Sequence, residues 1–430
     1  MLHTNRGPIE PMDEGTADME APSYADMPLG EPGSTGMAGA GFELHEPARE
    51  SETVTVGGWE VEVVGGQRIV VARGESESSY DDALTAGLLH AQKGLDLMSL
   101  RGGNNLMIKA FDDEHLVWWS DADATTVRLV SLAPVSIDVP PLTVTTTDAT
   151  GNVMTQQHQS VVWHESFRYF RLSQTTDDLF DAYRNAYLAL ESVLSSIAPQ
   201  LTNAAGKVVE GEGDWFKRAL AAADRIVPLA PFVPVGTADP VSSLFDELYR
   251  DMRSSMSHAK SGRRVLLPQD ESERQAVSES LKRLVGLYLR LAEQQLDARR
   301  LGGAMFAIAF RNSFAPTLEG MQVFVSNDES PFDPAGSVPN PGGGVLRELS
   351  PVGSAERGAG PFVVTRLWAT AAGDVADLPF IRRAVGMVDG TLAMASVLEG
   401  RLILTGADRL EVMLGVKGSN TRQPRDRYSF

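Results

Sequence analysis

The sequence predicts an α+β protein with a helical region in the middle of the chain and strand-rich regions on both sides of it. Short β-rich runs separated by glycine pairs fill residues 43–173. Apolar residues then recur at spacings of three and four along residues 174–302, and strand-like runs return in residues 303–430. A chain of 430 residues is too long for one ordinary core, so we expect several domains.

The composition restricts the classes of function. The 57 acidic and 38 basic residues give a formal net charge of -19, which opposes unspecific binding to DNA or to anionic membranes. The absence of cysteine excludes disulfides, thiolate metal sites and a cysteine nucleophile. Residues 1–20 lack the apolar run of a signal peptide, and no apolar stretch is long enough to span a bilayer. We therefore expect a cytoplasmic protein with neither a membrane nor DNA as its partner.

Residues 1–42 are expected to form a disordered acidic arm. They carry seven acidic residues against one arginine and contain few aromatic side chains. Such a segment buries too little apolar surface to offset the entropy lost on ordering. We favour a solvated tail over a targeting or partner-docking arm.

Residues 43–173 predict an α+β domain. Gly57-Gly58 and Gly65-Gly66 separate β-rich runs and are typical of hairpins. A helix is expected to begin near Ser79 or Asp81 and to end at Gly102. The expected strands are residues 53–56, 59–64, 68–72, 106–110, 115–119, 126–130 and 161–170.

Residues 174–302 predict a helical domain. Capping residues at 175–178 begin a helix that continues to about residue 198. Asp239 followed by Pro240 begins a second helix with a cap and a first-turn proline. A long third helix is expected over residues 270–300, with apolar positions that alternate by four and three, as in the seam of a helical bundle.

Residues 303–430 predict a β-rich C-terminal region. The expected strands are residues 305–310, 321–326, 363–369 and 402–404. A loop rich in proline and glycine is expected over residues 330–360, and a frayed basic end over residues 417–427.

Common catalytic and cofactor-binding motifs are missing from the sequence. It contains no phosphate-binding GxxxxGK[ST], no GxGxxG after a strand, no HExxH and no GxSxG. His158 and His164 would share one face of a strand, but no third ligand is evident nearby. We therefore interpret them as part of an ordinary exposed strand, and we expect neither a cofactor nor a metal.

One segment combines an arginine, a histidine and further cations. Arg253 precedes His258 by five positions near the end of an amphipathic helix, and Lys260, Arg263 and Arg264 follow. The residues three and four positions from Arg253 include no acid. We therefore expect its guanidinium to be free to bind an anion rather than to be held in an ion pair.

The R-x4-H spacing resembles the signature of the HEPN family of small helical domains that cleave or bind RNA. Residues 187–194 are similar to the first long helix of that family, and the resemblance is confined to the central region. It implies a metal-independent endoribonuclease in a toxin or defence setting. His258 would transfer the proton, and Arg253 would hold the phosphate oxygens.

The resemblance implies further roles. Lys260, Arg263 and Arg264 would guide RNA, and Glu191 and Ser254 would support the site. Two chains would form a homodimer through the helical domain, so that two arginine–histidine pairs meet in one cleft.

The residue after the arginine departs from the family pattern. Many active members have Asn, Asp or His at this position, where this chain has Ser254. A serine can form a hydrogen bond but supplies no charge. A second interpretation therefore stands beside the first: a non-catalytic binding or scaffold protein with an inactive HEPN-like dimerisation module.

Overall fold

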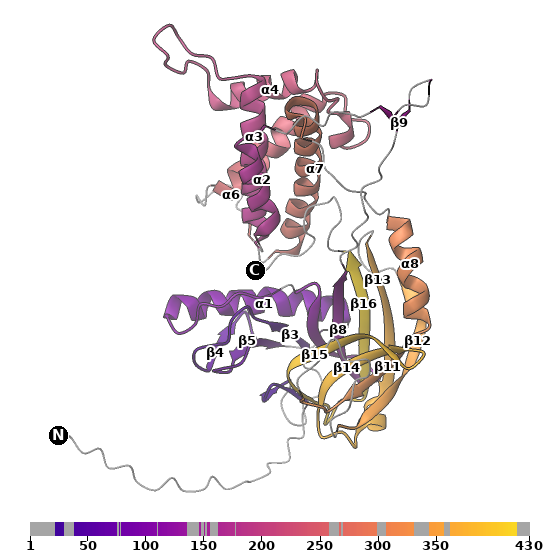
Figure 1. The fold of residues 1–430 in the computed structure, drawn as a ribbon. Helices are drawn as coiled ribbons and strands as arrows, with labels where there is room; N and C mark the ends of the chain where they lie inside the picture. Colours follow the sequence, from indigo (N-terminus) through magenta and orange to yellow (C-terminus); the bar gives the residue numbers. More distant parts are fainter. Residues whose placement is uncertain are drawn as a thin grey trace, which may run out of the picture.

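Strands from both ends of the chain form one large mixed sheet, and a group of helices lies beside it (Figure 1). The computed structural model describes residues 22–29, 38–74, 77, 79–109, 111–135, 146–147, 150, 153–154, 162–176, 178–257, 266–267, 270–298, 307–330, 344–356 and 362–418. Among these residues, no helix is both long enough and apolar enough to cross a bilayer.

The strands are β1 (Ser23–Tyr24), β2 (Met27–Pro28), β3 (Ala38–Glu43), β4 (Glu52–Val56), β5 (Trp59–Val63), β6 (Ile69–Gly74), β7 (Glu114–Ser120), β8 (Thr125–Val135), β9 (Thr146–Thr147), β10 (Val153–Met154), β11 (Gln322–Ser326), β12 (Leu346–Glu356), β13 (Val363–Ala371), β14 (Ile381–Val388), β15 (Thr391–Ile403) and β16 (Arg409–Gly418). The order in the large sheet is β2-β1-β15-β14-β11-β12-β13-β16-β8-β7-β3-β6-β5-β4.

The helices are α1 (Tyr80–Arg101), α2 (Ser166–Thr175), α3 (Leu179–Ile197), α4 (Glu212–Ala223), α5 (Pro240–Leu244), α6 (Ser254–Ser257), α7 (Glu271–Leu296) and α8 (Ala307–Glu319). Between α5 and α6 the chain forms a π-helix, η2 (Phe245–Arg253). Short 3-10 turns are η1 (Ala230–Phe232) and η3 (Ala372–Val375).

The N-terminal and C-terminal strand-rich regions share the large sheet rather than forming separate units. Strand β16 pairs in parallel with β8, from Arg409 opposite Thr126 to Gly418 opposite Val135. The other ladders of this sheet in the described residues are antiparallel. The helices α2 to α7 therefore lie in the sequence between the two halves of one sheet.

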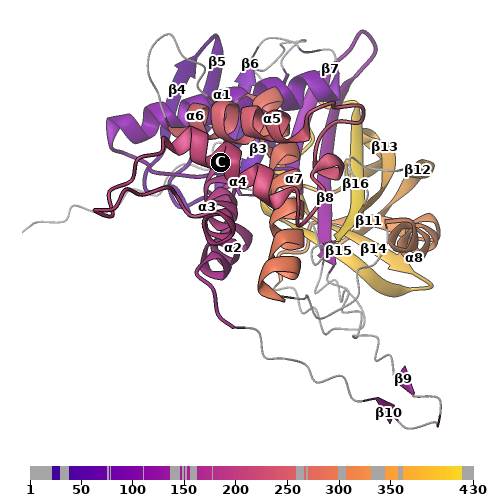
Figure 2. The same cartoon turned by 90° about the horizontal axis from the view of Figure 1, so that it is seen from above.

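Helices α1 and α8 pack on opposite faces of the sheet: α1 covers the strands at the β4 end, and α8 lies on β12, β13 and β16 near the middle of the strand order (Figures 1 and 2). Successive side chains of a strand point to opposite faces, and β7 shows this with two tryptophans. Trp118 lies in the core that includes α8, whereas Trp119 lies in the core beneath α1. Ser79 caps α1 by accepting from the Asp82 amide, and Gly102 ends it at φ 84°, which confirms both predicted ends.

The expectation of disorder over residues 1–42 is wrong for the parts that the structure describes. Residues 22–29 form β1, β2 and their turn, and β3 lies in the middle of the N-terminal half of the sheet. The composition misled because this strand needs small residues: a Cβ on Gly39 would lie 2.3 Å from the Ala72 carbonyl oxygen. Close packing, rather than large apolar side chains, orders this segment.

Two predicted strands are helices. Residues 161–170 overlap α2, where Phe170 stacks on Tyr288 of α7 with ring centroids 4.8 Å apart. Residues 305–310 overlap α8, where Phe310 packs on Phe314 one turn later. Aromatic residues favour strands, but here Phe170 packs on another helix and Phe310 packs on the residue one helical turn later, and both contacts stabilise a helix.

Other departures concern strands. Residues 106–110 make only an isolated bridge between Leu44 and Ile108, among the described residues. Strand β12 lies inside the segment predicted as a loop, only the end of β15 was predicted, and β14 and β16 were not predicted. Each of these strands contains glycine, proline or charged residues, which weaken the alternating apolar pattern.

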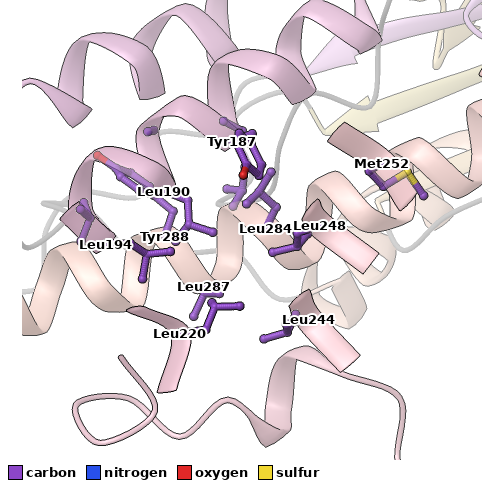
Figure 3. Packing of buried hydrophobic residues seen from close by; sticks show 14 of the residues in the cluster. Tyr187, Leu190, Leu194, Leu220, Leu244, Leu248, Met252, Leu284, Leu287 and Tyr288 are labelled. Carbon is purple, nitrogen blue, oxygen red and sulfur yellow. The ribbon is translucent and has the colours of Figure 1, made fainter. Parts of the chain in front are cut away.

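Helices α2 to α7, here called the helical region, enclose one hydrophobic core (Figure 3). The five apolar positions predicted along α7 are buried: Val277, Leu281, Leu284, Tyr288 and Leu291. Figure 3 shows Tyr187, Leu190 and Leu194 of α3 in the same core. Arg274 of α7 lies over the ring of Phe111, 5.1 Å from its centroid, and so contacts the sheet just before β7. The fold is α+β with a large mixed sheet.

Candidate functional site

The arginine of the R-x4-H segment lies at the end of an unusual helix. Asp239 caps α5 by accepting from the Ser242 amide at 3.0 Å, as predicted. The helix then widens into the π-helix η2, whose last residue is Arg253. Wide helical turns are rare and are frequent at functional sites. The end of η2, where Arg253 lies, is therefore a candidate functional site.

The guanidinium of Arg253 is held by a carboxylate. Its Nη2 donates to Oε1 of Glu212, at the start of α4, at 2.5 Å. Its Cζ lies 4.9 Å from the ring centroid of Tyr249 and 5.9 Å from that of Tyr187. The expectation of a free guanidinium is therefore wrong. It considered only neighbours one helical turn away, whereas the partner comes from another helix.

Arg250 behaves as its sequence neighbours predict. Its Nη1 donates to Oδ1 of Asp246, four residues earlier, at 2.9 Å, and both side chains are largely exposed. An exposed pair of this kind contributes little stability. Arg250 is therefore a surface residue, and Arg253 is the arginine of η2 that faces the interior of the helical region.

Glu191 lies close to Arg253, as the prediction that both belong to one site requires. Burial raises the pKa of Glu191, the Glu212 carboxylate raises it further, and Arg253 opposes both effects. Glu191 makes no hydrogen bond or ion pair with the residues that the structure describes. Ser254 is half-buried directly after Arg253, and its amide donates to the Asp251 carbonyl.

The remaining predicted site residues have no described positions. His258, Lys260, Arg263 and Arg264 lie outside the described residues, as does His158. His164 is described: its Nδ1 lies 3.2 Å from the Ser166 amide nitrogen and accepts its hydrogen at the start of α2. Among the described residues, no group of three histidine or acidic side chains is arranged to hold a metal ion.

An open acidic cleft lies where α2, α3 and α4 meet. Its volume is about 780 Å³. The residues that line it are Glu165, Tyr169, Leu188, Glu191, Ser192, Ser195, Gln200, Glu210, Glu212 and Trp215. Sequence reasoning had nominated Glu191 and missed the other three acids, because they come from separate segments that only the fold brings together.

Two of the four glutamates in the cleft already have cationic partners. Glu210 accepts two hydrogen bonds from Arg218, and Glu212 accepts from Arg253. Among the described residues, the Glu165 carboxylate accepts a single hydrogen bond, from the Ser192 hydroxyl at 3.3 Å. The cleft therefore keeps an excess of negative charge near Glu165 and Glu191.

A second group of titratable residues lies on the sheet, where β3 and β7 are neighbours. Burial and the facing carboxylate of Glu43 raise the pKa of Glu114 to about 7. Lys109 Nζ donates to Glu43 at 2.6 Å, and Ser131 Oγ donates to Glu114 at 3.3 Å. Both carboxylates border a cavity of about 30 Å³, and together they form a buried acid pair rather than an open site.

His115 lies next to Glu114 in β7 and faces α1. Burial lowers the pKa of His115 to about 4, so the ring is neutral at neutral pH. Its Nδ1 lies 2.7 Å from the Phe111 carbonyl oxygen, and its Nε2 lies 2.6 Å from the Tyr80 hydroxyl. The neutral ring therefore donates to the carbonyl through Nδ1 and accepts from Tyr80 through Nε2.

Comparison with known families, characterised proteins and solved structures finds no match to this chain.

Proposed function

We propose that the helical region is a non-catalytic binding module and that the protein acts as a binding or scaffold protein. The observation that carries this proposal is the ion pair between Arg253 and Glu212 at the edge of the acidic cleft. The arginine nominated to hold a phosphate is already neutralised by a carboxylate of the same chain.

The electrostatics of the cleft oppose an RNA substrate. A phosphodiester would have to displace Glu212 from Arg253 and would then face Glu191, which makes no hydrogen bond or ion pair with the described residues. A phosphate oxygen on Arg253 would only replace one hydrogen bond between charged groups by another of the same kind, so the exchange itself gains little. Like charges at close range in a partly desolvated site then make it unfavourable.

Ribonuclease activity is the competing interpretation, and an RNA cleavage assay separates the two. Labelled RNA is incubated in chelator with the parent protein, with Arg253→Ala and with His258→Ala. A fourth protein, Glu212→Gln, leaves the guanidinium without its carboxylate partner. The exposed Glu279 of α7 supplies a matched control, Glu279→Gln, with the same change of charge.

We expect all five proteins to leave the RNA intact. Cleavage by the parent that disappears in Arg253→Ala and His258→Ala would refute the binding role and establish the ribonuclease. Cleavage gained in Glu212→Gln but not in Glu279→Gln would also refute it, because the ion pair would then be restraining an active site.

The resemblance to HEPN domains stays a proposal, together with its two further implications. A homodimer formed through the helical region predicts twice the chain mass in light scattering. Binding of RNA without cleavage predicts retention of labelled RNA by the protein, with an affinity that falls as salt rises.

A further inference from the structure

Strand β4, at one end of the large sheet, has an edge without a neighbour. It pairs with β5 on one side, and no other strand among the described residues lies against it (Figure 1). The turn between β4 and β5 contains two glycines at positive φ, Gly57 at 59° and Gly58 at 84°. Such a two-residue turn fixes the register, so Val56 and Trp59 on its two sides exchange both backbone hydrogen bonds.

This register decides which backbone groups of β4 point away from the sheet. Hydrogen-bonded pairs alternate with non-bonded pairs along an antiparallel ladder, so Glu52 and Val54 bond to β5 as Val56 does. The N–H and C=O groups of Thr53 and Thr55 therefore point outward. Both threonines are exposed, and in the described part of the chain neither makes a hydrogen bond beyond the β4–β5 ladder. The edge thus offers two donors and two acceptors to an added strand.

The opposite edge of the sheet is protected, whereas the β4 edge is not. Strand β2 has only two residues and ends at Pro28, whose carbonyl oxygen accepts from Arg73 Nη1 at 2.9 Å. Natural proteins protect sheet edges with short strands, proline, bulges or charged residues. Beyond Glu52 at its start, β4 has none of these features, and its five residues are in continuous register with β5. An unprotected edge of this kind is the surface that β-strand addition uses.

The two faces of the hairpin determine which side chains suit an added strand. Val54 is buried beneath α1, so side chains of the added strand on this face meet apolar surface. On the other face the two threonines lie opposite Glu60 and Glu62 of β5. Arg73 Nη2 donates to both glutamates, so one negative charge is left over. Lysine and arginine side chains are long enough to extend across one strand, about 5 Å wide, towards this charge.

We propose that the β4 edge binds an extended segment of a partner protein as an added strand, with basic residues on the threonine face and apolar residues on the α1 face. The main-chain groups of Thr53 and Thr55 supply the hydrogen bonds. A second copy of this chain is disfavoured as the occupant, because each copy carries a net charge of -19. This surface belongs to the sheet, so the inference goes beyond the proposed function of the helical region and does not depend on it.

Hydrogen exchange of the full chain, read at single residues, tests the pairing directly. The probe is the peptide Ac-Lys-Val-Lys-Val-Lys-Val-Lys-NH2. At saturation it should slow exchange of the Thr53 and Thr55 amides about tenfold. The Val54 and Val56 amides already bond to β5 and should change little. The same peptide with N-methyl groups on its three central amides cannot donate to β4 and should protect neither threonine.

Fluorescence anisotropy with a labelled copy of the peptide separates backbone pairing from charge. Thr55→Pro removes an outward N–H without breaking a bond to β5 and should weaken binding about tenfold. Thr55→Val keeps this N–H and should bind as the parent does. Glu60→Gln should weaken binding severalfold, whereas Glu279→Gln, with the same change of charge at an exposed site of α7, should not. The exchange measurement uses the parent alone and decides the pairing even where a variant fails to fold.

Four results would overturn the inference. The first is a parent that does not bind the peptide, or binds it without protecting Thr53 and Thr55. The second is equal binding of the N-methylated peptide, because the backbone would then play no part. Equal weakening by Glu60→Gln and Glu279→Gln would reduce the attraction to the net charge. A dimeric parent in which both threonine amides are already protected would assign the edge to a second copy of the chain.

Discussion

Replacing Glu114 with glutamine is expected to stabilise the protein at neutral and alkaline pH. The Glu114 carboxyl group lies beside that of Glu43, and burial with this facing carboxylate raises its pKa from 4.5 to about 7. Glutamine has nearly the same shape and cannot ionise, so it resembles the protonated acid. Its amide can also donate a hydrogen bond to Glu43, as the protonated carboxyl group does.

The sign and the size follow from proton linkage. The folded state binds the Glu114 proton more tightly than the unfolded state does, so this contribution to stability is complete below pH 4.5 and is lost as the pH rises to about 7. Each pKa unit corresponds to about 1.4 kcal/mol. The difference between Glu114→Gln and the parent should therefore grow from near zero at pH 4.5 to about 3 kcal/mol above pH 7.

Hydrogen exchange of the β3 and β7 amides measures this difference locally, which suits a chain with several cores. Variant and parent are compared at the same pH, so that the intrinsic exchange rates cancel. Protection in Glu114→Gln should exceed that of the parent on the order of 100-fold at pH 8 and should equal it at pH 4.5. A constant ratio across this range would refute the reasoning, and Glu279→Gln should show a ratio near one throughout.

Two further predictions concern residues near the same sheet. In the Glu114→Gln protein the titration of His115 no longer overlaps that of Glu114. The folded pKa of His115, about 4, lies below the ordinary 6.5, so its contribution to stability is complete above pH 6.5 and should fall by about 2 kcal/mol between pH 6.5 and about pH 5. Burial also lowers the pKa of His90, which adds to this fall; a flat free energy of unfolding over this window would contradict the prediction. Gly87→Ala should lower the free energy of unfolding by about 1–3 kcal/mol, and with it the thermal midpoint. The reason is that a Cβ on Gly87 of α1 would lie 2.6 Å from the Cβ of Ala40. Gly286→Ala in α7 meets only a phenylalanine ring edge at 3.3 Å and should be neutral or mildly stabilising; equal destabilisation by both alanines would contradict the packing argument.

The elements that could be predicted from the sequence are those with strong local signals. Both ends of α1 follow from Ser79 and Gly102, and the buried face of α7 follows from its apolar spacing. Such signals involve residues within one or two turns of each other. Caps and periodicity therefore locate a helix before any tertiary contact is known.

The elements that were missed depend on distant partners. Strand β3 is ordered because α1 approaches closely enough to require Gly87 against Ala40, and its own sequence resembles that of a disordered tail. Strand β16 pairs with β8, whose residues lie almost three hundred positions earlier. No local pattern in the sequence indicates either contact. The composition of the β3 segment therefore predicts disorder instead of a strand.

The candidate site shows the same limit at the level of one side chain. Arg253 has no acid three or four positions away, and on that local pattern we expected it to be free to bind an anion. The fold brings Glu212 from 41 residues away to the guanidinium. The Arg253 charge, which its sequence neighbours leave unpaired, is therefore paired through the tertiary structure. Because of this pairing we propose binding rather than cleavage.

The negative charge of the protein opposes RNA binding both over the whole chain and locally in the acidic cleft. A net charge of -19 raises the cost of bringing RNA phosphates near any part of the chain, and the cleft repeats this excess locally with Glu165 and Glu191. The same field attracts cationic partners and accelerates their encounter.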